Sequence, residues 1–159
     1  MRTATLIRTV GLAVAFLAAS SAAAHHGFTG RYDSSRPLWI EGEVTNAYFG
    51  QPHPEVTIRT SGTMNAPTRQ EGLPGLADMI GNRVLEVRAD TRGQEVRIEF
   101  PPVGSFFGLG RIVSVGDRVA VIAYRNCNAP NQLRGQWIIP KTGAPVAYAG
   151  QAQQEVEGC

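Results

Sequence analysis

The sequence lacks most of the motifs and residue clusters that mark enzymes, nucleic-acid-binding proteins and membrane-spanning proteins. Its 159 residues include three histidines and two cysteines, and no run of lysines and arginines occurs. The patterns G-x-S-x-G, H-E-x-x-H and G-x-G-x-x-G, which indicate hydrolases, metalloproteases and dinucleotide-binding proteins, are also missing. We therefore expect a binding protein rather than an enzyme with a familiar catalytic set.

Residues 1–24 have the three parts of a secretory signal peptide. Arg2 and Arg8 form a basic start, residues 10–19 form an apolar run, and the small residues 20–24 offer cleavage sites. The apolar run is shorter than the roughly 20 residues that a membrane-spanning helix needs. This pattern predicts a protein of the periplasm or the exterior, cleaved near Ala23 and Ala24, with no stable membrane anchor after cleavage.

The charge of the mature chain argues against nucleic acid as a partner. Removing Arg2 and Arg8 leaves 13 basic residues, which balance the 13 acidic ones. Binding to phosphate groups generally requires a basic face. The partners that remain are a metal ion or another protein of the periplasm, and the oligomeric state stays open.

The two cysteines predict a disulfide. Cys127 and Cys159 belong to a chain that enters an oxidising compartment, where cysteines commonly pair. Such a bond stabilises by roughly 3–4 kcal/mol in the chain-entropy model. Ligation of a soft metal by two free thiols is the alternative, and the absence of C-x-x-C spacing makes it the weaker one.

The pattern after residue 24 predicts an all-β domain with no helix of normal length. Residues 25–37 show no periodicity and predict an extended N-terminal arm. Alternation of apolar and polar residues predicts strands at 38–49, 55–60, 83–89, 95–100, 118–125, 136–140 and 145–149. A long first strand that bends at Gly42 favours a small OB-like barrel of five to seven strands over residues 38–149. Residues 150–159 form a polar tail.

Two loops stand out in this domain. Residues 61–82 are rich in Gly, Pro, Asn and Thr, with a short helical turn predicted near 76–80, and so long a loop is usually functional or mobile. Residues 101–110 are rich in Gly and Phe, and Phe106 and Phe107 are placed to cap an open end of the barrel. Most of the other aromatic residues are expected in the core.

Several short motifs occur in the order found in one family of small exported bacterial proteins of unknown function. They are His25-His26-Gly27-Phe28, Asp33, Gly42-Glu43-Val44, Gln51-Pro52-His53 and Gly116-Asp117-Arg118-Val119. The chain resembles that family, whose mature proteins begin with His-His-Ser-Phe and have an Asn-Pro-His turn. Gly27 and Gln51 replace the family's serine and asparagine, while all three histidines are present. The resemblance implies an exported OB-like barrel and supplies no activity.

The histidines suggest a copper site whose chemistry depends on the cleavage position. Cleavage after Ala23 leaves His26 third in the chain, where the amine, two backbone amides and the imidazole can surround Cu(II) or Ni(II) in a square plane. Cleavage after Ala24 makes His25 the first residue, and its amine and ring can chelate one copper with His26 or His53 as a further ligand. The A-x-A rule permits both cuts, and the second is slightly favoured.

The predicted site therefore consists of His25, His26 and His53 as copper ligands. Asp33 or Glu55 is expected to orient an imidazole through a hydrogen bond. The plainer alternative is that His25 and His26 are solvated and that His53 bonds only within its own turn. We favour a copper carrier or sensor. A non-enzymatic module that binds a protein or small ligand through loops 61–82 and 101–110 comes second, and an oxidative copper enzyme third.

Overall fold

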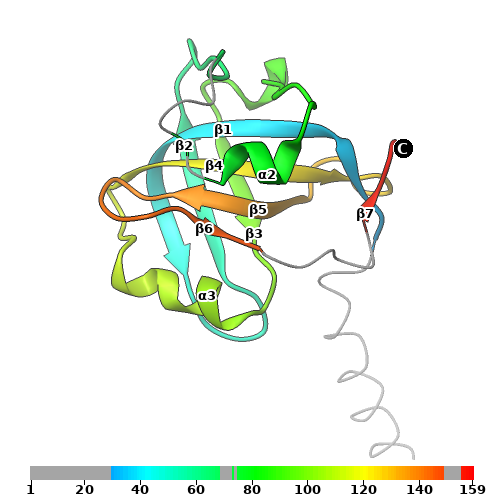
Figure 1. Ribbon diagram of the computed structural model, residues 1–159. Helices are drawn as coiled ribbons and strands as arrows, with labels where there is room; N and C mark the ends of the chain where they lie inside the picture. Colours follow the sequence, from blue (N-terminus) through cyan, green and yellow to red (C-terminus); the bar gives the residue numbers. More distant parts are fainter. Residues whose placement is uncertain (1–29, 69–72, 74, 149–154) are drawn as a thin grey trace, which may run out of the picture.

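The computed structural model describes residues 30–68, 73, 75–148 and 155–159, whose strands form one sheet that closes into a ring (Figure 1). The strands are β1 (Tyr32–Tyr48), β2 (Glu55–Thr60), β3 (Glu95–Glu99), β4 (Arg118–Asn126), β5 (Leu133–Ile139), β6 (Val146–Ala147) and β7 (Glu155–Val156). The helical segments are α2 (Leu76–Ile80), η2 (Ala89–Thr91), α3 (Gly104–Phe107) and η3 (Gly108–Arg111). None of the described helices is long and apolar enough to cross a membrane. The predicted β-rich fold is confirmed.

The ring closes because β1 pairs along both of its edges. The strands follow the order β2-β3-β5-β4-β1-β7, β6 pairs with β5, and an additional pairing joins β1 to β2. Gly42 has Thr60 of β2 as its partner on one edge and Val119 of β4 on the other. A Cβ atom added at Gly42 would lie 2.1 Å from the carbonyl oxygen of Arg59. The absence of a side chain there lets β2 approach β1 closely enough to close the ring.

Alternation along the strands places one set of apolar side chains inside the ring, and we call this set the inner core. Ile40 and Val44 of β1 belong to it, as the period-two pattern predicts. Phe106 of α3 is fully buried there, with its ring centroid 4.8 Å from that of Phe100. In Figure 1, α3 lies below the ring. The expected cap over an open end is therefore formed by Phe106, while Phe107 is half-buried.

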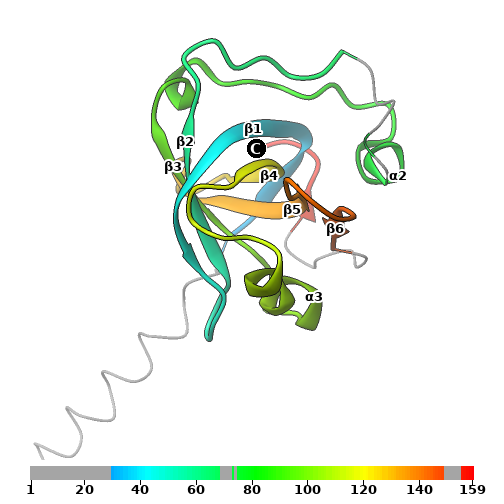
Figure 2. The same cartoon turned by 90° about the vertical axis from the view of Figure 1, so that its left-hand side faces the viewer.

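A second apolar cluster, which we call the outer cluster, lies on the opposite face of β1, β4 and β5. It contains Trp39 and Trp137, whose ring centroids are 6.3 Å apart. Leu76 and Ile80 of α2 and Met64 of the preceding loop also belong to it. Figure 2 shows α2 outside the ring on the side of β5. The described part of loop 61–82 thus packs hydrophobic side chains against the sheet, which explains its length in structural terms.

The first strand begins earlier than predicted. Residues 32–37, assigned above to an extended arm, belong to β1, and Tyr32 is fully buried. The register with β4 shifts between Asp33 and Leu38. This irregularity accommodates residues 34–37, whose serines and proline made the segment resemble a surface arm. The strand continues through it because both ends of the irregular stretch pair with β4.

The predicted strand at 83–89 is wrong. This segment makes a single isolated bridge, in which Glu86 pairs with Leu38. Leu85 and Val87 contact the outer cluster, while Val84 is 77% exposed. Their alternation is that of a strand, but the buried side chains pack on the outer face of the sheet. The backbone of this segment forms no ladder with a neighbouring strand.

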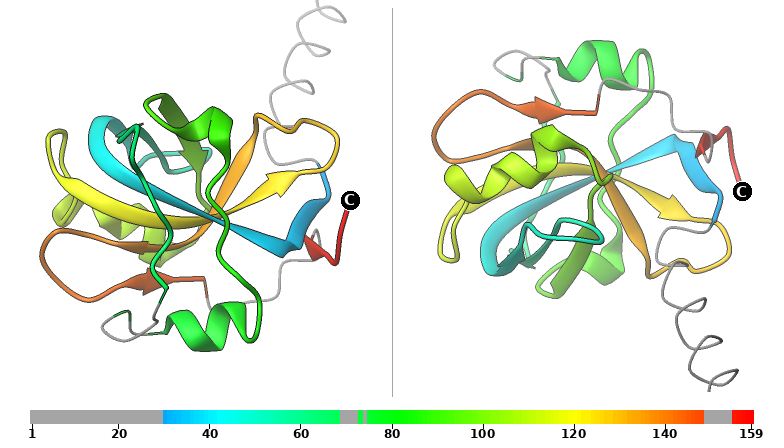
Figure 3. Two further views of the ribbon diagram at one scale, coloured as in Figure 1. Left: turned by 90° about the horizontal axis from the view of Figure 1, so that it is seen from above. Right: turned by 90° about the horizontal axis from the view of Figure 1, so that it is seen from below.

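The end of the predicted polar tail forms part of the sheet. Residues 155–156 form β7, which pairs in parallel with Tyr32 and Asp33. Figure 3 shows β7 beside the start of β1 from above and from below. The domain thus includes residues 155–159 as well as residues 32–148 of the described chain.

Replacing Gly42 with alanine is expected to destabilise the fold by about 2–3 kcal/mol, because the new Cβ atom must displace the backbone of β2. Urea unfolding at pH 7 measures this difference. Gly62→Ala is the matched control, since a Cβ atom at Gly62 has no neighbour within 4 Å, and its effect should stay within about 0.5 kcal/mol. Equal unfolding midpoints for the two variants would show that the close approach at Gly42 does not hold the ring closed.

Candidate functional site

His53 is the one predicted ligand among the residues that the structure describes. It lies in the turn between β1 and β2, and its side chain is half-buried. The backbone N–H of Phe100 donates to the carbonyl oxygen of Pro54 at 2.8 Å, which fixes the turn to the end of β3. Burial lowers the pKa of His53 below 6.5. The imidazole is therefore neutral at pH 7, which is the form that binds metals.

His25 and His26 lie outside the described residues, but the point where their segment joins the fold is clear. The backbone N–H of Cys127 donates to the carbonyl oxygen of Arg31 at 2.7 Å. Gly30 packs so closely on Asn126 that an added Cβ atom would lie 2.3 Å from its Nδ2. Gly30 and Arg31, which follow the segment with the two histidines, therefore lie beside the end of β4 and the loop after it.

A polar pocket lies beside Asn126, on which Gly30 packs. Asn126 donates from Nδ2 to Oε1 of Gln132 at 2.7 Å, and Gln132 lines a cavity of about 360 Å³. We call this cavity the polar pocket, and its lining residues are Arg97, Glu99, Ala129, Asn131, Gln132 and Leu133.

Strand pairing sets the width of this region. On its far side Glu99 pairs in register with Glu55, two residues after His53. Arg125 of β4 pairs with Leu133 of β5, Leu133 pairs with Ile98 of β3, and Ile98 pairs with Val56 of β2. Three strand-to-strand spacings therefore separate Arg125 from Val56. At about 4.8 Å a step, this separation is about 15 Å along the sheet.

Glu99 supplies the carboxylate in the lining of the polar pocket. Its side chain is 16% exposed, and burial raises its pKa, while the guanidinium of Arg97 3.3 Å away opposes that shift. Arg97 is shared with Glu55, to which it also donates a hydrogen bond. Sequence reasoning did not select Glu99 or Arg97. The available signal was the alternation of charges on β3, which places Glu95, Arg97 and Glu99 on one face.

The two carboxylates predicted to orient a histidine have other partners in the structure. Glu55 is ion-paired with Arg97. Asp33 accepts hydrogen bonds from the backbone and hydroxyl of Ser35 and from the backbone of Gly158, and Arg125 lies 3.9 Å away. Burial works against ionisation of Asp33, but these partners outweigh it and hold its pKa below 3.8. A role for either residue beside a histidine stays a prediction.

The predicted disulfide joins Cys127 to Cys159, so the described chain contains no free thiol pair for a soft metal. The described residues also contain no group of three histidine, cysteine, aspartate or glutamate side chains arranged to hold a metal ion.

The chain matches no family model and no curated protein. The family resemblance described above accordingly stays a prediction.

Glu99→Gln is expected to raise stability at pH 7. Because burial raises the pKa of Glu99 above 4.5, the folded state binds its proton more tightly than the unfolded chain does. Ionisation of Glu99 therefore lowers the free energy of unfolding as the pH rises from about 4.5 through the folded-state pKa. Urea midpoints of variant and wild type should converge toward pH 4 and separate at pH 7.

Glu95→Gln provides the matched control, because Glu95 lies on the same strand and is exposed. Its urea midpoint should show no comparable gain at pH 7. A Glu99→Gln protein that is less stable than wild type at pH 7 would mean that attraction to Arg97 outweighs burial.

Proposed function

We propose that this protein is an exported copper carrier or sensor built on a small OB-like barrel. The OB-like assignment is supported by the ring order β2-β3-β5-β4-β1, by the parallel pairing of β3 with β5, and by the doubly paired first strand. Barrels of this type bind ligands on the face of strands two and three, between the loops that follow strands one and four. In this chain those loops are residues 49–54 and 127–132.

The observation that carries the copper proposal is the short path across the sheet between the strand that pairs with the start of β1 and the strand that follows His53. Arg125 of β4 and Val56 of β2 are three strand steps apart, about 15 Å along the sheet. His25 is five residues from Gly30, and five extended residues span at most about 17 Å. We infer that the amino-terminal histidines can approach the turn of His53 and share one ion with it.

The chemistry of these groups suits copper. A free amine, backbone amides and neutral imidazoles are nitrogen donors, and Cu(II) prefers such donors in square-planar or tetragonal geometry. His53 contributes a neutral ring because burial lowers its pKa. With a cut after Ala24, the His25 amine and ring bind the ion first; with a cut after Ala23, His26 supplies the imidazole of a square-planar set.

Binding and release explain the arrangement better than turnover does. The amino-terminal ligands belong to a short segment, whereas His53 lies in a turn fixed to β3. A site made from His53 and ligands of the amino-terminal segment is proposed to pass its ion to another protein. We therefore place the protein in the periplasm or outside the cell, with a copper-donating or copper-accepting protein as its partner.

A second candidate function, binding of a small polar molecule without metal, is favoured by the polar pocket itself. Its lining combines one guanidinium, one carboxylate and two carboxamides within about 360 Å³. Met64 and Leu76 of loop 61–82 are buried in the outer cluster, and Phe106 of loop 101–110 is buried in the inner core.

Copper titration of the mature protein tests the proposal. Mass spectrometry first establishes the amino terminus, and competition with a chelator of known affinity then gives the Cu(II) dissociation constant. His26→Ala should weaken binding by about a hundredfold or more, and His53→Ala by at least about tenfold, since each loses a direct ligand. Gln51→Ala, in the same turn as His53, is the control and should bind as the wild type does.

Two results contradict the copper proposal. One is a dissociation constant no lower than that of a free peptide with the same terminal sequence. The other is an unchanged constant in His26→Ala. Binding that is strong but indifferent to His53→Ala would confine the site to the terminal segment.

A further inference from the structure

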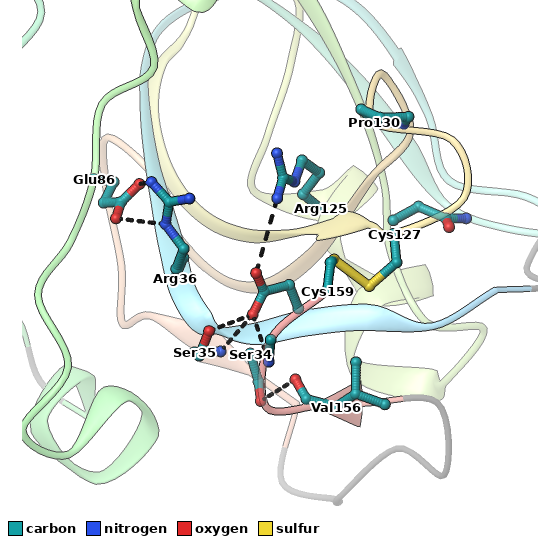
Figure 4. Close-up of polar contacts among 12 residues, drawn as sticks. Ser34, Ser35, Arg36, Glu86, Arg125, Cys127, Pro130, Val156 and Cys159 are labelled. Carbon is teal, nitrogen blue, oxygen red and sulfur yellow. Dashed lines mark hydrogen bonds and ion pairs between the residues drawn. A yellow bond between two sulfur atoms is a disulfide. The ribbon is translucent and has the colours of Figure 1, made fainter.

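The carboxyl-terminal residues are held against the start of β1 at a cluster around Asp33. Figure 4 shows Ser34, Val156 and the Cys127–Cys159 bond in this region. The backbone N–H of Gly158 donates to Oδ1 of Asp33 at 3.1 Å. The hydroxyl of Ser34 donates to the carbonyl oxygen of Val156 at 3.0 Å. Together with the two paired residues of β7, these contacts make Asp33 the point where the two ends of the described chain meet.

These contacts are few for a segment of five residues, 155–159. β7 has two residues, and both are half-buried. Strands this short do not stay in place by their own hydrogen bonds, because ordering the backbone opposes them. The covalent bond from Cys159 to Cys127 is therefore what keeps residues 155–159 docked.

The disulfide is open to attack. Cys159 is exposed, Cys127 is half-buried, and both lie at the surface next to the loop that follows β4. Exposed disulfides are the ones that exchange with external thiols while the protein stays folded. The bond is thus accessible to external thiols, and its cleavage removes what keeps residues 155–159 docked.

We propose that Cys127–Cys159 is a thiol-reducible latch on the amino- and carboxyl-terminal segments. A dithiol, such as that of a thiol–disulfide oxidoreductase, attacks Sγ of Cys159 as a thiolate, and Cys127 leaves as a thiolate that takes up a proton. The second thiol of the reductant then resolves the mixed disulfide. The reductant becomes a disulfide and the protein gains two thiols, so two electrons and two protons are transferred. Residues 155–159 leave β1, while the ring stays closed.

Opening the latch also loosens the start of the amino-terminal segment. Cys127 donates its backbone N–H to Arg31, and Asp33 loses the Gly158 N–H when the tail leaves. If the copper proposal above holds, on which this consequence rests, opening weakens the contribution of His53 by releasing the segment that must reach it. The latch itself does not depend on copper.

Hydrogen exchange of the mature protein tests the latch. In dithiothreitol at pH 7, amides 31–35, 127 and 155–159 should exchange at least about tenfold faster, while β2, β3 and residues 118–123 keep their protection. The rate of reduction should rise linearly with dithiothreitol and should not change in low urea, because attack occurs on the folded protein. Protection that stays unchanged after complete reduction overturns the latch, and so does an equal loss of protection throughout the ring.

Two variants complete the test without free thiols that would themselves bind copper. The Cys127→Ser, Cys159→Ser double variant should show the same local exchange pattern as the reduced protein. Asp33→Asn keeps the disulfide and should raise exchange at 158 and 35 only. An Asp33→Asn protein that exchanges like the double variant would assign the opening to the carboxylate and overturn the role of the disulfide.

Copper titration of the double serine variant separates the two proposals. A dissociation constant about tenfold higher than that of wild type supports the coupling between latch and site. Wild-type affinity together with local opening overturns the coupling. Absence of copper binding in every protein, wild type included, overturns the copper proposal and leaves the exchange result as the test of the latch.

Discussion

The double pairing of β1 is the constraint on which the rest of the structure depends. A strand of 17 residues that bends around the sheet presents its first part to β4 and its last part to β2. Gly42 lies where the two pairings overlap, and the lack of a Cβ atom allows the backbone of Arg59 to approach. Everything enclosed by the ring, including the burial of Phe100 and Phe106, follows from that closure. The two ends of β1 are paired with the end of β4 and the start of β2.

The same closure explains why the molecule has two hydrophobic clusters. A closed ring uses one face of each strand for its interior, so apolar side chains on the other face need a separate cover. Trp39 and Trp137 provide such a surface, and Leu76 and Ile80 of α2 cover it. Loop 61–82 is long because it must cross the outside of the ring before the chain returns to form β3. Its composition resembled that of a binding loop, but its buried residues are those of a structural cover.

Sequence patterns predicted the regular parts of this fold and failed where distant contacts decide. β2 was predicted at its observed bounds, because strict alternation over six residues between turn signals has one reasonable interpretation. The segment 83–89 shows the same alternation and forms no ladder. Alternation indicates only that one face of a segment is buried and the other exposed, and it does not say whether a paired strand or a packed surface buries it. Residues 32–37 were missed for the opposite reason. Their serines and proline fit an irregularity that exists only because β4 pairs on both sides of it.

The candidate site was predictable in part and for similar reasons. His53 was selected because a histidine between two prolines is conspicuous, and its role as a ligand stays a prediction. The disulfide was predicted because two cysteines in a chain expected to be exported have few alternatives. The polar pocket was not found, because it depends on Glu99 and Gln132, whose proximity arises from the parallel pairing of β3 with β5.

That pairing gives the functional proposals their common physical basis. Because the ends of β3 and β4 and the starts of β2 and β5 meet at one edge of the ring, the disulfide at Cys127 and the turn that carries His53 adjoin strands that pair with one another. The ring is held by long strand pairings, whereas residues 155–159 are held by two paired residues and the disulfide. This difference is the physical basis of the proposal that the tail opens while the ring keeps its fold.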